Sequence, residues 1–182
     1  APNPDLKWET TGQLGAGIDA SFLNGKYRIN IDYYKKNTKD LLAIIPLPGS
    51  TGFTSLVTNL GEIQNMGMEF SLGATFGKED FTWDVNGQLS FNKNEVITIG
   101  EDIFGGALDI PFNSPVNIAR EGEPLGMFYG FIEDGYDDQG VIQYQDLNND
   151  GEVTNEDQTI LGGPYPDFIY ALNSTLNYKS LS

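Results

Sequence analysis

The stretch from Asp146 to Asp157 carries the side chains of this sequence that are best spaced to bind a metal ion. Its sequence, DLNNDGEVTNED, puts oxygen-bearing side chains at the first, third and fifth positions of a loop and glycine at the sixth. This spacing is typical of EF-hand-like calcium loops, in which oxygen ligands surround a hard cation and the glycine permits a sharp turn. The expected calcium ligands are Asp146, Asn148, Asp150, Glu152 through its backbone carbonyl, Thr154 directly or through water, and Asp157.

Two features separate this loop from a complete EF-hand. Asp157 stands at the twelfth position in place of the usual Glu, as in dockerin-like loops, and its shorter side chain weakens the expected affinity. No amphipathic helix precedes the loop. The alternative interpretation is a solvated acidic turn, and the spacing favours a structural calcium ion over that alternative.

The elements that must position this loop are predicted to be β-strands. Met66–Phe76 and Phe81–Phe91 alternate strictly between apolar and polar residues on either side of the polar turn Gly77–Asp80. Alternation with a period of two places the apolar set on one side of a pleated sheet. A second hairpin of the same kind is built around Asn24-Gly25, a strong turn signal. The five predicted strands are residues 12–23, 26–45, 63–76, 81–97 and 167–178.

The connections between these strands alternate in length. Asn24-Gly25 and Gly77–Asp80 are tight, whereas Pro46–Gly61 and Asn92–Asp167 are long, and the last is predicted to be mostly irregular. All the tight turns therefore lie at one end of the sheet, as in up-and-down outer-membrane barrels. An antiparallel sandwich also alternates and also has unequal loops, so the pattern alone leaves both architectures open.

The composition excludes several classes of function. Acidic residues number 26 against 10 basic residues, for a net charge of −16, which argues against binding to nucleic acid or to an anionic lipid surface. The sequence has no His and no Cys, so it offers no Ser-His or Cys-His pair, no imidazole ligand and no disulfide. No apolar run approaches the ~20 residues of a membrane-spanning helix.

Carboxylates outside the acidic loop could in principle form the acid–base pair of a glycosidase. Glu69 and Asp84 fall on the polar face of the predicted strands, where the charges that line a barrel lumen are expected. Glu62 and Glu95 are the other candidates. Trp8 and Trp83 could stack on a sugar, but packing is the commoner role of such residues. We therefore predict that the chain is not an enzyme.

Five stretches of the sequence, in order along the chain, resemble the SusC/RagA-type family of TonB-dependent outer-membrane receptors. One has the pattern N-x-G-x-x-x-N-x-G-x-E. The stretches are Asn3–Glu9, Asp32–Leu42, Asn59–Glu69 with that pattern, Phe128–Gly130 and Asp146–Asp157.

The resemblance implies an all-β fold of antiparallel up-and-down strands, part of a large transmembrane β-barrel with long extracellular loops. Such receptors close a 22-stranded barrel with a plug and lie in the outer membrane of Gram-negative bacteria, in contact with its lipid. A SusD-like surface lipoprotein captures glycan or peptide cargo, and TonB energises nutrient import. From its position in the long loop, we expect Phe128–Gly130 to pack against the partner lipoprotein.

We expect residues 1–182 to be an internal segment of such a barrel, with about five strands and a long outer loop over 92–167 that contains the calcium-loop-like motif. No plug or TonB-interacting segment is recognisable, and the chain ends at Ser182 without a terminal aromatic residue. The alternative function is that of a soluble, calcium-stabilised β-sandwich that binds carbohydrate. The sequence does not specify the transported substrate.

Overall fold

The computed structural model describes residues 2–46, 49–105 and 115–179, and it divides into two compact units. The first unit comprises Ala1–Asn94 and Pro166–Ser182, and the second comprises Glu95–Tyr165. Among the described residues, no helix is long and apolar enough to cross a membrane.

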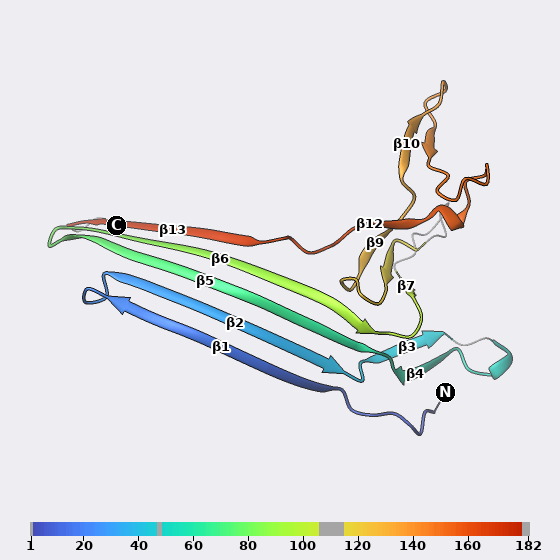
Figure 1. The fold of residues 1–182 in the computed structure, drawn as a ribbon, viewed down its shortest axis with the longest axis horizontal. Coiled ribbons are helices and arrows are strands. Elements are labelled where there is room, and N and C mark those ends of the chain that lie inside the picture. The colour runs from blue at the N-terminus through green and yellow to red at the C-terminus, as the bar shows by residue number, and fades with distance from the viewer. Residues whose placement is uncertain (1, 47–48, 106–114, 180–182) are drawn as a thin grey trace. The chain divides into compact units, whose positions relative to one another are not determined.

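Five long antiparallel strands form the sheet of the first unit, in the order β1-β2-β5-β6-β13 (Figure 1). Each strand lies beside the long strand that precedes it in the chain, so the topology is an up-and-down meander, as predicted. All five predicted strands are present. Their bounds are β1 Thr10–Phe22, β2 Tyr27–Lys39, β5 Glu62–Lys78, β6 Phe81–Thr98 and β13 Ile169–Tyr178.

The registers of these strands collect the apolar side chains on one side of the sheet. Ile31 of β2 is paired with Ile18 of β1 and with Phe70 of β5, while the adjacent Asn30 is paired with Asp19 and Ser71. The apolar face carries Leu14, Ile18, Ile29, Ile31, Phe70, Leu72, Val85, Leu89, Leu172 and Leu176. The polar face carries Asp19, Arg28, Asn30, Asp32, Glu69, Ser71, Asp84, Asn86 and Asn173.

The second predicted strand ends earlier than the sequence indicated. β2 stops at Lys39, and Asp40 then takes a φ of 55°, a left-handed conformation that interrupts the ladder and that Asp tolerates better than most residues. After this break, β3 (Leu42–Pro46) pairs with β4 (Ser55–Asn59) in a separate two-stranded sheet, with a 3-10 turn at Gly49–Thr51 between them. The predictions of one strand over 26–45 and of a loop over 46–61 are therefore wrong.

Asn59, the first residue of the N-x-G-x-x-x-N-x-G-x-E pattern, anchors the N-terminal segment to this small sheet. Its side-chain amide donates to the carbonyl oxygens of Lys7 (2.9 Å) and Asp40 (2.7 Å), and its side-chain oxygen accepts the backbone N–H of Lys7 (2.8 Å). Nearby, the backbone N–H of Leu42 donates to the Glu9 carboxylate (2.7 Å). Two of the stretches that resemble the receptor family, Asn3–Glu9 and Asn59–Glu69, are therefore bonded to each other.

The second unit contains short strands within the stretch that the sequence predicted to be long and mostly irregular, although most of its described residues lie outside strands. A four-stranded sheet has the order β12-β9-β8-β7, and β10 pairs separately with β11. Residues 106–114 of the predicted loop lie outside the described residues. The strands are β7 Ile103–Gly105, β8 Asn117–Ala119, β9 Met127–Gly130, β10 Glu133–Tyr136, β11 Ile142–Tyr144 and β12 Thr159–Gly162.

A small apolar core stabilises the second unit. Val96 and Ile118 are each only 1 % exposed, and Ala119 and Met127 are also buried. The backbone of Val96 is held from both sides, because its N–H donates to Glu123 and its carbonyl accepts from Gly122. The strands around this core are three or four residues long, too short to display the alternation by which a strand is recognised in a sequence.

Replacing Asn59 with Ala should loosen the N-terminal segment in the intact protein. The change removes three hydrogen bonds, each worth about 0.5–1.5 kcal/mol. Hydrogen exchange at the Lys7 amide should therefore accelerate by at least about tenfold. Asn3→Ala is the matched control, because it removes the bonds to the Val57 carbonyl and from the Asp5 N–H and leaves the Lys7 amide bonded. Equal exchange in both variants would contradict the anchoring role of Asn59.

Candidate functional site

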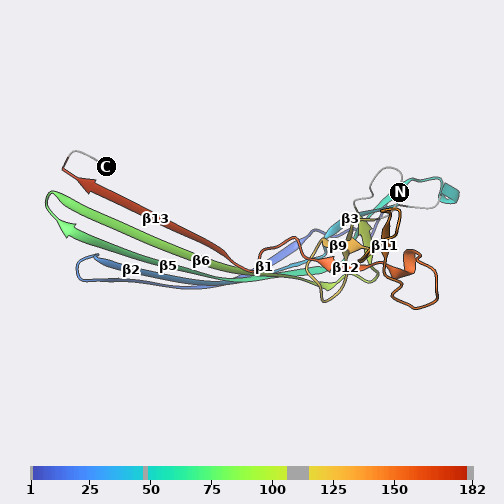
Figure 2. The same cartoon turned by 90° about the horizontal axis from the view of Figure 1, so that it is seen from above.

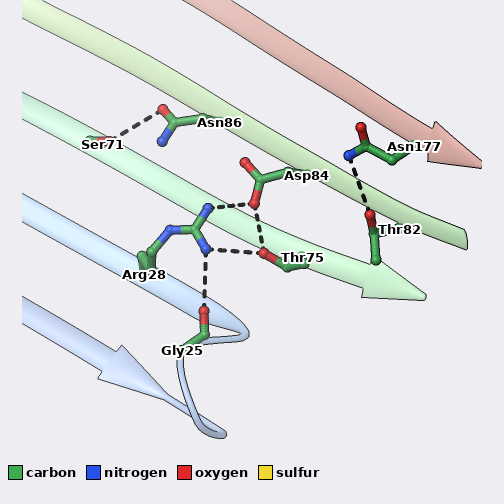
Figure 3. Close-up of polar contacts among 8 residues, drawn as sticks. All are labelled: Gly25, Arg28, Ser71, Thr75, Thr82, Asp84, Asn86 and Asn177. Carbon is green, nitrogen blue, oxygen red and sulfur yellow. Dashed lines mark hydrogen bonds and ion pairs between the residues drawn. The ribbon is translucent and has the colours of Figure 1, made fainter. Parts of the chain in front are cut away.

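A charged hydrogen-bond network joins three strands on the polar face near the tight turns (Figure 3). Arg28 of β2 donates from Nη2 to the Asp84 carboxylate of β6 (2.8 Å) and from Nη1 to the Thr75 hydroxyl of β5 (3.0 Å). Its Nη1 also donates to the Gly25 carbonyl in the turn (3.2 Å), and the Thr75 hydroxyl donates to Asp84 (2.6 Å). Asp84 is thus neutralised by an ion pair rather than left free as a catalytic acid or base.

Further along the polar face, the side chains are mostly acidic or neutral. Asp32 and Glu69 are direct partners on β2 and β5, and like charges at such positions repel. The Asp32 carboxylate lies over Gly17 of β1, so it leans away from Glu69. These two acids line a hollow of about 240 Å³ together with amide and hydroxyl side chains of β2, β5 and β6. The hollow presents hydrogen-bond acceptors to polar solutes.

The apolar face has aromatic side chains near both ends of the strands. At the turn end, Phe76 packs on Trp83 with ring centroids 5.5 Å apart, and Lys26 lies over the Phe76 ring at 5.8 Å. At the other end, Phe91 packs against Phe70 and Phe168, each with centroids 6.4 Å apart. One aromatic cluster therefore lies beside the tight turn, and a second lies at the opposite end of the strands.

Between the two aromatic clusters the apolar face is open. Leu72 on β5 and Leu172 on β13 are 61 % and 72 % exposed, and Ile18 on β1 is 65 % exposed. Large aliphatic side chains in the middle of a β-sandwich sheet would be covered by a second sheet. No other part of the chain that the structure describes covers them, so their surroundings are expected to come from outside these residues.

In the second unit, the acidic loop is curled around the Asp146 carboxylate. One oxygen of Asp146 accepts the backbone N–H groups of Asn149 (2.6 Å) and Asp150 (3.2 Å), and the other accepts that of Gly151 (2.8 Å). Gly151 has a φ of 93°, which confirms that the sharp turn requires glycine at this position. The Asn148 amide donates to the Asp150 carboxylate (3.0 Å), so the first three predicted ligands lie close together.

Asp157, the predicted ligand at the twelfth position, is fully buried and caps backbone groups. One of its oxygens accepts from the N–H groups of Leu147 (2.8 Å) and Asn148 (3.2 Å), and the other accepts from Thr154 N–H (2.8 Å). These bonds, that from Thr154 first, hold the pKa of Asp157 below its usual range despite burial. Thr154 in turn caps the 3-10 turn Asn155–Asp157 by accepting from Glu156 N–H (3.3 Å).

The loop therefore has two parts with different hydrogen-bond roles. Asp146, Asn148 and Asp150 hold the curled first half, whereas Thr154 and Asp157 form a capping box that closes the second half. Glu152 donates its backbone N–H to Asp150 (2.8 Å). Within the described part of the chain, no three His, Cys, Asp or Glu side chains are grouped as a metal site. Calcium binding stays a prediction.

The remaining candidate residues are dispersed. The Glu62 carboxylate accepts a hydrogen bond from Asn37 and lies 3.6 Å from the Lys39 ammonium. Glu62 is therefore near one end of β2, whereas Arg28 and its partner Asp84 are near the other end. Glu95 belongs to the second unit. The four candidate carboxylates are not brought together. Trp8 is 90 % exposed, and Trp83 donates from its indole N–H to Ser174 (2.9 Å).

Phe128–Gly130 lies in β9 of the four-stranded sheet in the second unit. The Tyr129 ring packs on Phe104 with centroids 5.4 Å apart, while Phe128 is 48 % exposed. Tyr129 therefore supports its own sheet, and Phe128 is the residue of this stretch that is open to a partner.

The sequence reasoning missed the contacts that Arg28 and Tyr34 make across the sheet. The Tyr34 hydroxyl donates to the Asn92 side chain of β6 (2.8 Å), as the Arg28 guanidinium does to Asp84. The available signal was the presence of Gly67 and Gly73 inside a strand, because an interior strand glycine often marks a close approach of other atoms.

Comparison with known proteins identifies the protein family of this chain. Residues 1–181 match the family model described as TonB dependent receptor-like, beta-barrel. TonB-dependent receptor P3 of Formosa agariphila is 35 % identical over 198 residues, which cover 98 % of this chain and 20 % of the receptor. TonB-dependent receptor SusC of Bacteroides thetaiotaomicron is 34 % identical over 190 residues, covering 98 % of the chain and 19 % of SusC.

The fold agrees with that of a solved transporter. The structure of the RagAB peptide transporter matches with a TM-score of 0.81 at 23 % sequence identity, over 98 % of this chain and 20 % of the solved chain. At that identity the match establishes the fold. The chain spans about one fifth of the length of the curated relatives that it matches.

Proposed function

Because the chain belongs to the TonB-dependent receptor-like β-barrel family, we propose that its five long strands form part of the wall of an outer-membrane receptor that imports nutrients. The fold is that of antiparallel strands from such a barrel, and the alternative of a soluble β-sandwich is wrong. The relatives are named as receptors, in keeping with a role in transport rather than catalysis.

The observation that carries this proposal is the difference between the two faces of the sheet. In the proposed barrel, the apolar face meets the lipid chains and the polar face lines the lumen. Phe81 and Phe91, at the two ends of the apolar part of β6, are ten residues apart, or roughly 33 Å along a strand. A strand tilt of about 35–45° reduces this to about 25 Å along the membrane normal, which is the height of the apolar band of such barrels.

The connections give the proposed orientation. The tight turns at Leu23–Lys26 and Glu79–Asp80 lie at one end of the sheet and fit the short periplasmic turns of outer-membrane barrels. The longer connections, with β3, β4 and the second unit, would then be extracellular. The second unit would replace one long outer loop with a folded structure, since its own core buries Val96 and Ile118.

The proposed cargo and partners follow from the relatives. Membership of the family supports energisation by TonB, through parts of the receptor outside this chain. The names SusC and RagAB peptide transporter support a SusC/RagA-type importer of glycans or other nutrients, including peptides, that works with a SusD-like lipoprotein. Amide and carboxylate side chains on the polar face would hydrogen-bond to the hydroxyl groups of a glycan or the N–H groups of a peptide.

A second proposal concerns the acidic loop, where calcium would have a structural role. Support comes from the close placement of the Asp146, Asn148 and Asp150 side chains on the curled half of the loop. Calcium would offset the repulsion between Asp146 and Asp150. It would bind as in weak extracellular sites, with a Kd of roughly 10⁻⁴–10⁻³ M, and stabilise the folded unit by about 2.7 kcal/mol at a hundredfold excess over Kd.

The barrel-wall proposal predicts opposite behaviour for neighbouring residues on β5. In the full receptor, a fluorescent label at Leu72 should be quenched by brominated lipid, whereas a label at Ser71 should not. Leu72→Arg should also destabilise the receptor by about 2–4 kcal/mol, because a charge would enter the hydrocarbon. Ser71→Arg is the matched control, since it faces the lumen. Equal quenching at both positions would contradict the proposal.

The import proposal predicts a cargo whose uptake depends on both this receptor and TonB. Cells lacking the receptor should lose accumulation of at least one class of labelled oligosaccharide or oligopeptide, and cells lacking TonB should lose the same class. Uptake of every tested class at wild-type rates in the receptor-deficient strain would contradict an importing role, whatever the membrane position of the strands.

The calcium proposal predicts that Asp150→Ala abolishes calcium binding. Calorimetric titration of the full receptor should show binding heat that this variant lacks, and proteolysis between Phe131 and Pro166 should increase in the variant or after chelation. Asp138→Ala is the control, because it removes an equal charge from the nearby β10–β11 hairpin, outside the motif. An absence of calcium heat in the wild type would reduce the motif to an acidic turn.

A further inference from the structure

The pairing of β2 with β5 is not fixed by a tight turn. Tight turns set the register of β1 with β2 and of β5 with β6, but residues 40–61, including a separate hairpin, lie between β2 and β5. A slip of β2 by one residue would place its polar side chains beside the apolar side chains of β5, so the alternating polarity of the two strands excludes it. A slip by two residues returns every side chain to its original face, so alternation cannot exclude it.

Two side chains of β2 pass over β5 on the polar face and bond to β6. Arg28 reaches Asp84 (2.8 Å), as Figure 3 shows, and Tyr34 reaches Asn92 (2.8 Å). β5 lies between β2 and β6, so each bonded pair of side chains together bridges two interstrand spacings, roughly 9–10 Å. Such a path is open only where the middle strand has no side chain in the way.

A glycine of β5 lies beneath each of these side chains. Gly73 is paired with Arg28, and Gly67 is paired with Tyr34. A Cβ added to Gly67 would lie 2.6 Å from the Tyr34 ring and also 2.6 Å from the backbone carbonyl oxygen of Phe91, and one added to Gly73 would lie 2.9 Å from Arg28 Nε. Neither glycine has a positive φ, so glycine is needed here for space and not for backbone conformation.

The spacing of the two glycines matches that of the two side chains that cross them. Arg28 and Tyr34 are six residues apart on β2, as Gly67 and Gly73 are on β5. A slip of two residues in one direction would bring Arg28 over Ser71 and Tyr34 over Asn65. A slip in the other direction would bring them over Thr75 and Glu69. Both slipped registers put a side chain beneath each crossing residue, so only the observed register leaves both paths open.

We propose that Arg28 and Tyr34, seated over Gly73 and Gly67, set the register of β2 against β5 and thereby align the two hairpins β1–β2 and β5–β6. The hydrogen bonds to Asp84 and Asn92 then tie β2 to β6, in addition to the backbone pairing of β2 with β5. This role concerns the assembly of the sheet, and it holds whatever cargo the receptor carries.

The test uses cysteine crosslinking in the full receptor, freed of any other cysteine. A cysteine at position 29 faces position 72 in the observed register, and it would face position 70 or 74 after a slip of two residues. The wild-type background should crosslink 29 with 72 and not with 70 or 74. Gly67→Ala should lower the 29–72 crosslink and the yield of heat-modifiable receptor severalfold. Gly15→Ala should change neither, because the nearest atom to its added Cβ is at an ordinary 3.8 Å.

The double variant Arg28→Ala/Gly73→Ala decides between a register device and general damage, because the three nearest atoms to a Cβ added at Gly73 all belong to the Arg28 side chain. If Gly73 keeps a path open for Arg28, Gly73→Ala should lower both readouts in the wild-type background and change neither in the Arg28→Ala background. The defect of Gly73→Ala should be milder than that of Gly67→Ala, because the flexible Arg28 side chain can move. The inference is overturned if Gly67→Ala behaves like Gly15→Ala, or if Gly73→Ala lowers both readouts as much in the Arg28→Ala background as in the wild type.

Discussion

In the five-stranded sheet, the backbone pairing that satisfies the N–H and C=O groups also determines which side chains face the surroundings of the sheet. Every interior strand satisfies its N–H and C=O groups by pairing with two neighbours, and the same pairing leaves Ile18, Leu72 and Leu172 exposed together on one face. In water such a continuous apolar face would promote association. In a bilayer it is the side of a barrel strand that meets hydrocarbon, where backbone groups must be paired within the protein. The receptor family to which the chain belongs therefore accounts for the exposure of this face, because in such a barrel the face meets hydrocarbon.

The polar face serves a different purpose, because its side chains bond to one another rather than to lipid. Arg28, Thr75 and Asp84 connect three strands near the tight turns, and Tyr34 and Asn92 connect β2 to β6 further along. Between them, Asp32 and Glu69 line an acidic hollow that is open to polar solutes. The face that would line the lumen thus combines contacts that hold the strands in register with acceptors for solute.

The acidic loop shows how backbone groups are satisfied where strands are short. Asp146 and Asp157 each accept three backbone N–H groups, which stabilise the turns on either side of the motif. Burial of Asp157 is tolerated because these donors favour its charged form. A spacing typical of calcium loops is therefore also a spacing that folds the segment by hydrogen bonds alone, and the two roles are compatible for Asp146, Asn148 and Asp150.

Local patterns in the sequence determined the five long strands, their two faces, the tight turns and, through five short motifs, the receptor family. They could do so because alternation is a property of neighbouring residues and is strong in strands of ten or more residues. The tertiary structure decided what depends on distant partners: the break at Asp40, the pairing of β3 with β4, the short-stranded sheet of the second unit and the capping role of Asp157. It also decided the register of β2 against β5. Alternating polarity is unchanged by a slip of two residues, so only the meeting of Arg28 and Tyr34 with Gly73 and Gly67 distinguishes the observed pairing.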